Sequence, residues 1–562
     1  DEAGASVIDR ALNPMERLLR GLRLSSSPAP SLPDAPTEDL PSNRDEVSPA
    51  AEEKNQGAVL CNASGTLDAY EPEGGDFREI HGSVFVGIRA SSSAAASGPR
   101  VFLLTIEDEK GGDLMSVQLS NDLMTQFHSR EMSMIWIVNA DSSTNDEMRC
   151  FCIRFKDPEE FQTFRSQFSV CLFEANNDIS FSELKGEDQS WMKEVNRDDV
   201  EMEDIAEGEE EEDDPELQED EEPALFDGDE RNQHLAVASN YDRSFVVRGS
   251  RMGVFSTNDG IGLSTTLNLQ SRDGKFFSPS KVLLHEQDSA MLLLDGTDSS
   301  RILRMDLERG AVVDEWNDER LGIGTPIKNL TRVEKYANLT PSREFIGMND
   351  SNLLRIDPRV SSLVAQQKAY ARSTKAQLSC AATTGVGHIA VASVSGDVRL
   401  YDTIGKNAKT HIAGMGGEPV LGIDVTEDGF YVLVTKKSFL QLLDTRVKGQ
   451  EKGGFLKSMG ANKPIPRILS IRPEDIAKHR MGQVSFTPAH FNMGRSMERS
   501  IVTSTGPFLV VWNFRQVKQG KLYAYQIRRY RDDVVADDFA FDDDGKVIVT
   551  MPNEITIAAR SK

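Results

Sequence analysis

The chain has 562 residues, enough for more than one domain, with a formal net charge of -27 and a pI near 4.8. Its five cysteines are sparse and odd in number, which argues against a disulfide-stapled scaffold and favours a reducing setting, cytoplasmic or also nuclear. No run of eighteen apolar residues occurs, so no membrane-spanning helix is expected, although the first residue is Asp1 rather than Met and a targeting signal is left open.

Residues 1–55 are predicted to form a flexible N-terminal segment. Within it, Ser6 to Leu24 carries apolar and arginine side chains at helical spacing, interrupted by Pro14. This stretch is interpreted either as an amphipathic helix for a membrane surface or a partner, or as an end that folds only on contact. The stretch from Ser25 to Ala51 is rich in serine, proline and acidic residues, which indicates a linker.

Residues 56–180 are predicted to form a small domain that resembles a pleckstrin-homology barrel. Apolar and alternating runs indicate strands at 84–88, 101–104, 134–138 and 150–155. A helix is then predicted to start at Pro158, with Asp157 as its N-cap and Glu160 completing a capping box. Its apolar face would plug one open end of the barrel, and consists of Phe161, Phe164, Phe168, Cys171 and Leu172.

Charge near the first predicted hairpin of this domain argues against lipid headgroups as ligands. A phosphoinositide site needs clustered lysine and arginine side chains that meet several phosphates at once. The stretch from Leu67 to Ile80 instead carries five acidic residues and only one basic residue, Arg78. The sequence therefore predicts that this domain binds protein.

Residues 181–230 are predicted to be an acidic, disordered linker. Between Asp198 and Glu230, 20 of 33 residues are Asp or Glu and none is Lys or Arg, so mutual repulsion opposes compaction. From residue 231 to 562 there are 45 basic and 36 acidic residues, a balance of about +9. The opposite signs motivate the hypothesis that the acidic tract docks on the following domain, and a hydrodynamic size that salt leaves unchanged would count against it.

Residues 231–562 are predicted to form a seven-bladed β-propeller of the WD40-like kind. Seven apolar runs recur at steps of about 42 to 51 residues, with one longer step of about 69, and most are preceded by a turn containing Asp or Gly. A period in the forties with several short strands per unit is typical of propeller blades. The runs end near Phe255, Asp306, Asp357, Asp402, Asp444, Trp512 and Ile557.

Motifs that carry chemistry are sparse. No phosphate-binding loop, nucleophile elbow or His-Glu-x-x-His motif occurs, so no enzyme activity, cofactor or small-molecule substrate is expected. Cys150 and Cys152 could ligate a metal only with further ligands, of which His128 is the nearest, and buried structural thiols are favoured. The run from Asp542 to Gly545 resembles half a calcium loop but is interpreted as a hairpin turn.

Two blade ends carry an apolar residue followed by Asp, any residue and Arg, at Asp357 to Arg359 and Asp444 to Arg446. This pattern resembles the motif by which propeller proteins dock on the adaptor of a cullin ubiquitin ligase, with Ile356 and Leu443 in place of the usual tryptophan. The same pattern also caps turns between strands. Arg359 and Arg446 are therefore the candidate partner-binding residues.

Three longer stretches carry a specific resemblance. The sequences 398–445, 500–520 with 525–541, and 157–176 are similar to the vacuolar import and degradation protein 27 family, whose plant members are called Cypro4-like. The resemblance covers residue 56 to the C-terminus and implies the same order of barrel, acidic linker and propeller. It implies a link to vacuolar breakdown of cytosolic proteins and no catalytic residue.

The sequence thus predicts a non-enzymatic protein-interaction adaptor, with contacts through the propeller loops and the barrel domain. Two weak sites on one chain gain avidity through their linker. A substrate receptor for a cullin-type ligase is one alternative. A nucleic-acid- or chromatin-associated protein is another, although the basic residues of 231–562 are not interleaved with aromatic residues as stacking would require.

Overall fold

The computed structural model describes residues 57–559 except 92–99, 139–147, 178–179, 185, 195–222, 227, 258–259, 299–300, 372–375, 415–417, 448–452, 461–462, 464 and 495–496. The predicted N-terminal helix and most of the acidic linker lie outside these residues. The described chain forms two compact units. The first runs to Glu183 and includes Pro473–Arg480, and the second comprises Leu184–Arg472 and the chain from Met481 onwards. Within the described residues, no helix is long and apolar enough to cross a membrane.

The first unit is built on one antiparallel sheet in the order β4-β3-β2-β1-β7-β6-β5. The strands predicted at 84–88, 134–138 and 150–155 fall within β2, β6 and β7, and the strand predicted at 101–104 overlaps β3. The strands are β1 (Val59–Glu71), β2 (Asp76–Ala90), β3 (Phe102–Asp108), β4 (Asp113–Gln118), β5 (Gln126–His128), β6 (Ser133–Val138) and β7 (Arg149–Phe155). The unit also contains two short 3-10 turns, η1 (Asn121–Leu123) and η2 (Phe181–Glu183), and two α-helices that are described next.

Helix α2 (Pro158–Asn176) starts where the sequence predicts. The Asp157 side chain accepts hydrogen bonds from the backbone N–H groups of Glu159 and Glu160, at 2.8 and 2.9 Å. The predicted capping box is wrong, because Glu160 Oε2 turns to β1 and accepts from Ser64 N and Ser64 Oγ, at 2.8 and 2.9 Å. Glu160 therefore fastens the helix to the sheet, 96 residues away in the chain.

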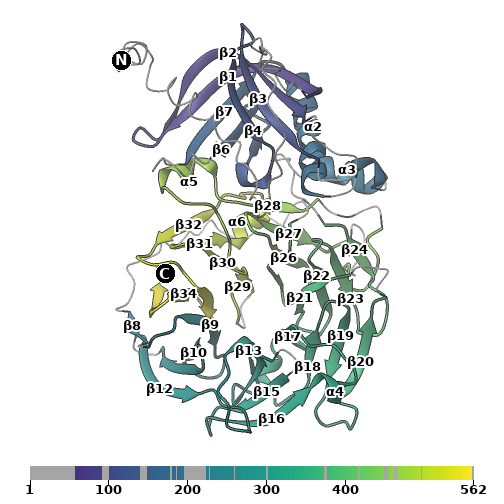
Figure 1. Ribbon diagram of the computed structural model, residues 1–562, viewed down its shortest axis with the longest axis vertical. Coiled ribbons are helices and arrows are strands. Elements are labelled where there is room, and N and C mark those ends of the chain that lie inside the picture. Colours follow the sequence, from purple (N-terminus) through teal and green to yellow (C-terminus); the bar gives the residue numbers. More distant parts are fainter. Residues whose placement is uncertain are drawn as a thin grey trace, which may run out of the picture. The chain divides into compact units, whose positions relative to one another are not determined.

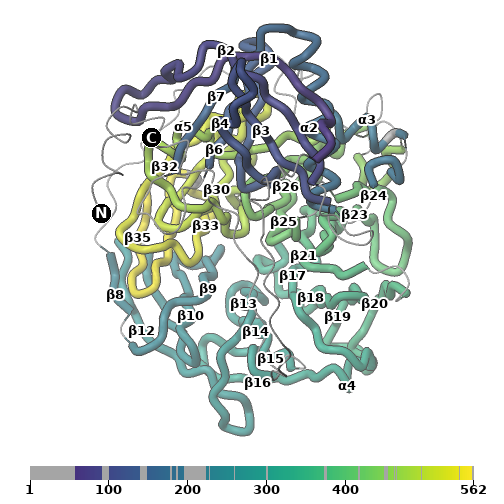
Figure 2. The backbone as a smooth tube through the Cα atoms, turned by 45° about the horizontal axis from the view of Figure 1, so that its top comes forward, coloured from purple at the N-terminus to yellow at the C-terminus, as the bar shows by residue number. Residues whose placement is uncertain are grey.

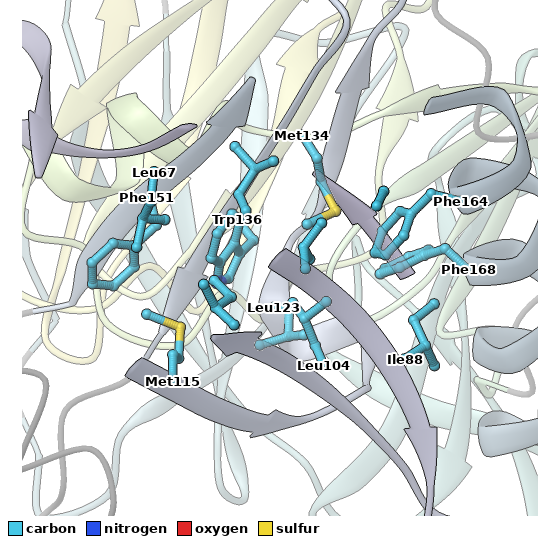
Figure 3. Packing of buried hydrophobic residues seen from close by; sticks show 14 of the residues in the cluster. Leu67, Ile88, Leu104, Met115, Leu123, Met134, Trp136, Phe151, Phe164 and Phe168 are labelled. Atoms are coloured by element: carbon cyan, nitrogen blue, oxygen red, sulfur yellow. The ribbon is translucent and has the colours of Figure 1, made fainter. Parts of the chain in front are cut away.

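The apolar face of α2 completes the core of this unit, as predicted. Phe161, Phe164, Phe168 and Cys171 are buried in one cluster with residues of the sheet, and Leu172 packs at its margin. Figure 3 shows Phe164 and Phe168 at the helix side of this cluster and Trp136 in its middle. Burial of such aromatic side chains contributes roughly 1.5–3 kcal/mol each, so the helix is held mainly by packing.

Strands β6 and β7 are buried on both faces. Met134 and Phe151 point into the core, whereas Ile135 and Cys150 are buried without belonging to the core cluster. Helix α5 (Pro473–Lys478), which belongs to the first unit, contacts β6 and β7 and buries Ile476. A segment about 300 residues further along the chain thus helps to cover the outer face of the sheet.

The second unit is a ring of seven four-stranded antiparallel sheets, which confirms the predicted seven-bladed propeller (Figure 1). Blade 1 contains β9 (Asn232–Val237), β10 (Arg243–Arg248), β11 (Arg251–Ser256) and β12 (Gly262–Asn268). Blade 2 contains β13 (Pro279–His285), β14 (Ala290–Asp295), β15 (Arg301–Asp306) and β16 (Ala311–Asn317). Blade 3 contains β17 (Asn329–Arg332), β18 (Phe345–Met348), β19 (Asn352–Ile356) and β20 (Val364–Ala369).

The remaining blades repeat this plan, and each blade's first strand lies innermost (Figure 2). Blade 4 contains β21 (Leu378–Thr383), β22 (Ile389–Ser393), β23 (Val398–Tyr401) and β24 (Thr410–Ile412). Blade 5 contains β25 (Gly422–Val425), β26 (Tyr431–Thr435), β27 (Leu440–Asp444) and β28 (Arg467–Leu469). Blade 6 contains β29 (His490–Phe491), β30 (Ser500–Thr505), β31 (Phe508–Asn513) and β32 (Tyr525–Arg529). Blade 7 contains β33 (Ala536–Ala540), β34 (Asp543–Thr550), β35 (Glu554–Ala559) and β8 (Ala224–Leu225).

The seven apolar runs that predicted the blades are their third strands. These strands lie between the second and fourth strands of each sheet and are mostly apolar and buried, with a partly exposed arginine inside the strand in blades 2, 3 and 4. The longer step of about 69 residues has a structural cause, because the chain between β27 and β29 contains helix α5 of the first unit. Short helices α4 (Asp318–Leu321) and α6 (Phe514–Lys518) follow the outer strand of blade 2 and the third strand of blade 6.

The ring is closed by β8, which joins the far end of the chain as the outer strand of blade 7. Leu225 pairs with Glu554 and Ala224 pairs with Ile555. Part of the predicted linker 181–230 is therefore a propeller strand. Another part forms helix α3 (Gly186–Glu194), in which Trp191 is buried and Asp188 makes a 3.0 Å ion pair with Lys463.

Candidate functional site

The centre of the propeller holds a pocket of about 400 Å³ lined by the inner strands of all seven blades. Its charged side chains are unevenly distributed. Lys281 on β13 and Arg332 on β17 bring positive charge to blades 2 and 3, whereas carboxylates come from blades 5 and 7. The lining acids are Asp424 on β25 and Asp537 and Asp538 on β33, with His234 and His490 on blades 1 and 6.

One end of this channel is closed by the connection between β17 and β18, residues 333–344, which we call the floor loop. It includes the 3-10 turn η3 (Ala337–Leu339). Lys335 N donates to Thr384 O of blade 4 at 3.0 Å. Asn338 Nδ2 donates to Ser239 Oγ of blade 1 at 2.9 Å and to Asp288 Oδ1 of blade 2 at 3.1 Å.

The floor loop also reaches the blades on the opposite side of the ring. Tyr336 Oη donates to Gly494 O in blade 6 at 3.0 Å, and its ring meets Phe541 of blade 7 edge-on with centroids 6.2 Å apart. Lys335 Nζ donates to Val425 O of blade 5 at 2.5 Å. All these partners lie at or beside the turns between first and second strands, so a loop from one blade contacts the six others at this end of the channel.

Lys335 is the centre of a buried charge cluster that joins the floor loop to the channel wall. Its Nζ lies 3.2 Å from Asp424 Oδ1 and 3.9 Å from Glu498 Oε1, and 5.6 Å from the centroid of the Phe491 ring. The Lys335 side chain is 4% exposed. Burial raises the pKa of Glu498, and the neighbouring ammonium of Lys335 opposes that rise. The cluster is therefore a buried ion pair whose members depend on one another.

Asp537 is a buried carboxyl group in the wall between blades 6 and 7. Its Oδ2 accepts from Ser504 Oγ at 2.7 Å and from Thr487 Oγ1 at 3.0 Å. Burial raises the pKa of Asp537 from 3.8 to about 6, against the opposing effect of these hydroxyl groups and of His490. Burial also raises the pKa of its neighbour Asp538. The wall thus takes up protons more readily than the unfolded chain does.

Replacement of Asp537 by asparagine is expected to change how stability depends on pH. The folded chain holds a proton on Asp537 up to about pH 6, whereas the unfolded chain loses it near pH 3.8. The stability that this group contributes is therefore full below about pH 3.8 and is lost as pH rises through 6, a loss on the order of 3 kcal/mol. Urea unfolding at pH 4 and pH 7 should show a smaller decline for D537N than for the unchanged chain.

Asp538 and Glu498 retain their raised pKa values in this variant, so part of the decline is expected to persist. The variant D350N, which removes an exposed carboxylate in blade 3, controls for the loss of one negative charge. Equal declines in D537N and the unchanged chain would contradict the assignment.

The structure places Arg359 after β19 in blade 3 and Arg446 after β27 in blade 5. Because both follow third strands, they lie on the same face of the ring, with blade 4 between them. Each guanidinium donates a hydrogen bond to the Asp of the same motif. Arg359 Nε donates to Asp357 Oδ1 at 2.8 Å, and Arg446 Nη2 donates to Asp444 Oδ2 at 2.5 Å. The side chains remain 58% and 45% exposed.

The Asp of this motif also shapes the turn that follows the third strand. Asp357 Oδ1 accepts from Arg359 N at 3.0 Å, and Asp444 Oδ1 accepts from Arg446 N at 2.9 Å. In blade 2, Asp306 Oδ1 likewise accepts from the backbone N–H two residues ahead, at 3.1 Å, although that residue is Glu308 and not an arginine. A turn-forming role therefore accounts for these residues, and docking on a ligase adaptor stays a prediction.

The other sequence candidates have structural positions. Cys150 and Cys152 are buried, and burial raises the pKa of both thiols, of Cys152 to about 12. Among the described residues, no three His, Cys, Asp or Glu side chains are grouped so as to hold a metal ion. Asp542 lies in the tight turn between β33 and β34, as interpreted, whereas Asp543 to Gly545 belong to β34, so the predicted turn is confirmed only at its first residue.

Sequence reasoning missed the pocket and its floor loop. The lining residues are single charges on short apolar strands, as Lys281 and Asp424 illustrate. A charged residue inside an apolar inner strand is the one signal that could have drawn attention to the channel. It does not reveal which charges meet, because that depends on closure of the ring.

Both domains match domains of known proteins. Residues 230–562 match the VID27 C-terminal WD40-like domain and residues 58–175 match the VID27 PH-like domain, which confirms the predicted barrel type. Two relatives are called Vacuolar import and degradation protein 27. The relative from Schizosaccharomyces pombe is 42% identical over 346 residues, and that from Saccharomyces cerevisiae is 35% identical over 349 residues.

These matches cover 59% and 58% of this chain but 42% and 43% of the relatives, so the chain spans less than half the length of the curated relatives that it matches. Among solved structures, the β-propeller domain of Cps50 (Swd1) from Myceliophteria thermophila has a TM-score of 0.43 at 10% identity. That comparison covers 61% of this chain and 99% of the other.

Proposed function

This chain belongs to the VID27 family, and from that premise we propose that it is a non-enzymatic protein-interaction adaptor in the vacuolar import and degradation of cytosolic proteins. The observation that carries the proposal is the match of both domains, in the same order, to the two domains of this family. The names of the two relatives supply the process. A cytoplasmic location is part of the proposal.

The arrangement of each unit supports an adaptor. The propeller offers loops on two faces of a closed ring, and such rings commonly carry protein contacts. On the barrel, the β1–β2 hairpin exposes acidic side chains, and its Arg78 is already paired with Glu71 at 2.6 Å. This charge favours a protein partner over a phosphoinositide headgroup. Two contact regions on one chain would raise the avidity for an assembly that offers both.

The proposal is tested by following a cytosolic cargo into the vacuole in cells that lack the endogenous chain. Delivery of the cargo is expected to slow, and the full chain is expected to restore it. Proximity labelling with the full chain should then enrich proteins of vacuolar delivery over a cytosolic control protein. Unchanged cargo delivery, together with a labelled set like that of the control, would overturn the proposal.

Two variants divide the remaining possibilities in the same experiment. Removal of residues 198–222, which keeps β8 and Phe226 in place, is expected to reveal new partners if the acidic tract docks on its own propeller, and to leave the labelled set unchanged if it is a spacer. The charge reversals R359E and R446E together should lose a ligase adaptor if the chain is a substrate receptor. Both arginines are partly exposed, but Arg446 also donates to Tyr431 Oη at 2.8 Å, so circular dichroism must show that the double variant is folded.

A further inference from the structure

The pocket at the propeller centre contains positive charge that lacks a partner within the described residues. Arg332 Nη1 meets only the Met493 thioether, at 3.8 Å, and Arg332 Nε is buried without a hydrogen-bond partner. Lys281 Nζ has no hydrogen bond or ion pair with any other described side chain, although Lys281 is accessible from the pocket. A guanidinium left without partners inside a protein is costly, so a missing counter-charge is indicated.

The carboxylates nearest to Arg332 are engaged elsewhere. Asp288 Oδ2 accepts from the backbone N–H groups of Ser239 and Asn240, both at 2.7 Å. Asp424 accepts from Lys335 Nζ and, at 2.9 Å, from Phe491 N. Asp538, whose effect on the pKa of Arg332 is the largest among the carboxylates, accepts from Phe539 N at 2.9 Å. Asp538, Asp288 and Asp424 attract the guanidinium without forming a described ion pair with it.

The two cations also lie close enough to repel one another. The positive charge of Arg332 lowers the pKa of Lys281, in addition to a larger effect of burial in the channel. The Cys380 thiol on β21, the inner strand of blade 4, acts on the pKa of Lys281 in the opposite direction. An anion between Lys281 and Arg332 would remove this repulsion and give both groups a partner.

The size and shape of the pocket restrict what can supply that anion. A volume of about 400 Å³ lies within the range of small-molecule sites. The floor loop closes one end of the channel, so an extended peptide cannot thread through it. Apolar groups of Ile423, Phe491 and Met493 in the wall would contact the rest of a compact ligand.

We propose that the central pocket of the propeller binds a small organic anion, whose phosphoryl or carboxylate group pairs with Lys281 and Arg332. The open mouth of the channel admits the ligand, and the floor loop forms the base of the site. This inference goes beyond the adaptor function and does not depend on it. A bound anion would stabilise the ring, because it joins blades 2 and 3.

The test measures binding of inorganic phosphate, pyrophosphate and citrate to the purified full chain by isothermal titration calorimetry at low ionic strength. The three probes separate phosphoryl from carboxylate preference. At least one should bind with one-to-one stoichiometry, and K281Q and R332Q should each weaken it by about tenfold or more, because each removes a charge-assisted hydrogen bond. The matched control is K275Q, which removes an exposed lysine just before β13 and should bind like the unchanged chain.

Circular dichroism will show whether each variant is folded. Should R332Q fail to fold, K281Q decides the matter, because the Lys281 side chain is accessible and no partner depends on it within the described residues. The proposal is overturned if none of the three probes binds the unchanged chain at concentrations on the order of 10 mM. It is equally overturned if K281Q binds with unchanged affinity, since the anion would then lie elsewhere.

Discussion

Replacement of Lys335 by methionine is expected to destabilise the propeller by about 3–5 kcal/mol, the usual cost of removing one partner from a buried ion pair. The reason is that Asp424 and Glu498 would lose their nearest described cation, at 3.2 and 3.9 Å, while staying inside the protein. Val425 O would also lose the hydrogen bond from Lys335 Nζ. Urea unfolding of the full chain at pH 7, followed by far-UV circular dichroism, measures the change.

The matched control lies in the same blade. Lys328 makes a 2.6 Å ion pair with Asp350, but both side chains are more than half exposed, so K328M should cost less than about 1 kcal/mol. The double variant K335M/E498Q should be more stable than K335M, because it also removes one of the two buried carboxylates that have lost their cation. A loss in K335M no larger than that in K328M would show that the floor loop does not depend on this cluster.

Replacement of Arg248 is expected to open the seam that closes the ring. Arg248 lies on β10 of blade 1 and is buried, and its Nη2 donates to Pro552 O at 2.7 Å and to Asn553 Oδ1 at 2.6 Å. Its Nη1 donates to Phe226 O, directly after β8, and its guanidinium lies 5.3 Å from the centroid of the Phe226 ring. One side chain therefore joins the first blade, the last blade and the strand that completes it.

The variant R248M would leave these carbonyl groups without their donor, and a loss of about 3–5 kcal/mol is expected. Hydrogen exchange followed by mass spectrometry should show the fastest new exchange in β8 and β35. R248K keeps the charge but cannot form the same forked contacts, so it should recover only a small part. The control R309M, at an exposed ion pair in blade 2, should leave exchange at the seam unchanged. Protection of β8 that survives in R248M would refute the role of Arg248 in closure.

Local patterns in the sequence were enough to predict the architecture. The third strand of each blade is mostly apolar and buried, and it recurs once per blade, as at Leu443 and Trp512. The start of α2 is equally local, because Asp157 bonds to N–H groups two and three residues ahead. Glu160 shows the limit of such reasoning. Its carboxylate accepts a hydrogen bond from Ser64 N of β1 and does not cap the N-terminus of its own helix.

The sequence by itself determined the number of blades, because apolar runs repeat at a regular spacing along the chain. It also determined the family and the order of the domains, because long stretches resemble those of the family. Only the tertiary structure decided the chemistry of the centre. Lys281 and Arg332 are 51 residues apart in sequence, Arg332 and Asp424 are 92 apart, and all three lie on separate strands. They meet because the ring closes, and the floor loop pairs Lys335 with Asp424 while Lys281 and Arg332 stay without a partner. Periodicity reports which face of a strand is buried, whereas the pairing of charges depends on contacts between blades that no local pattern encodes.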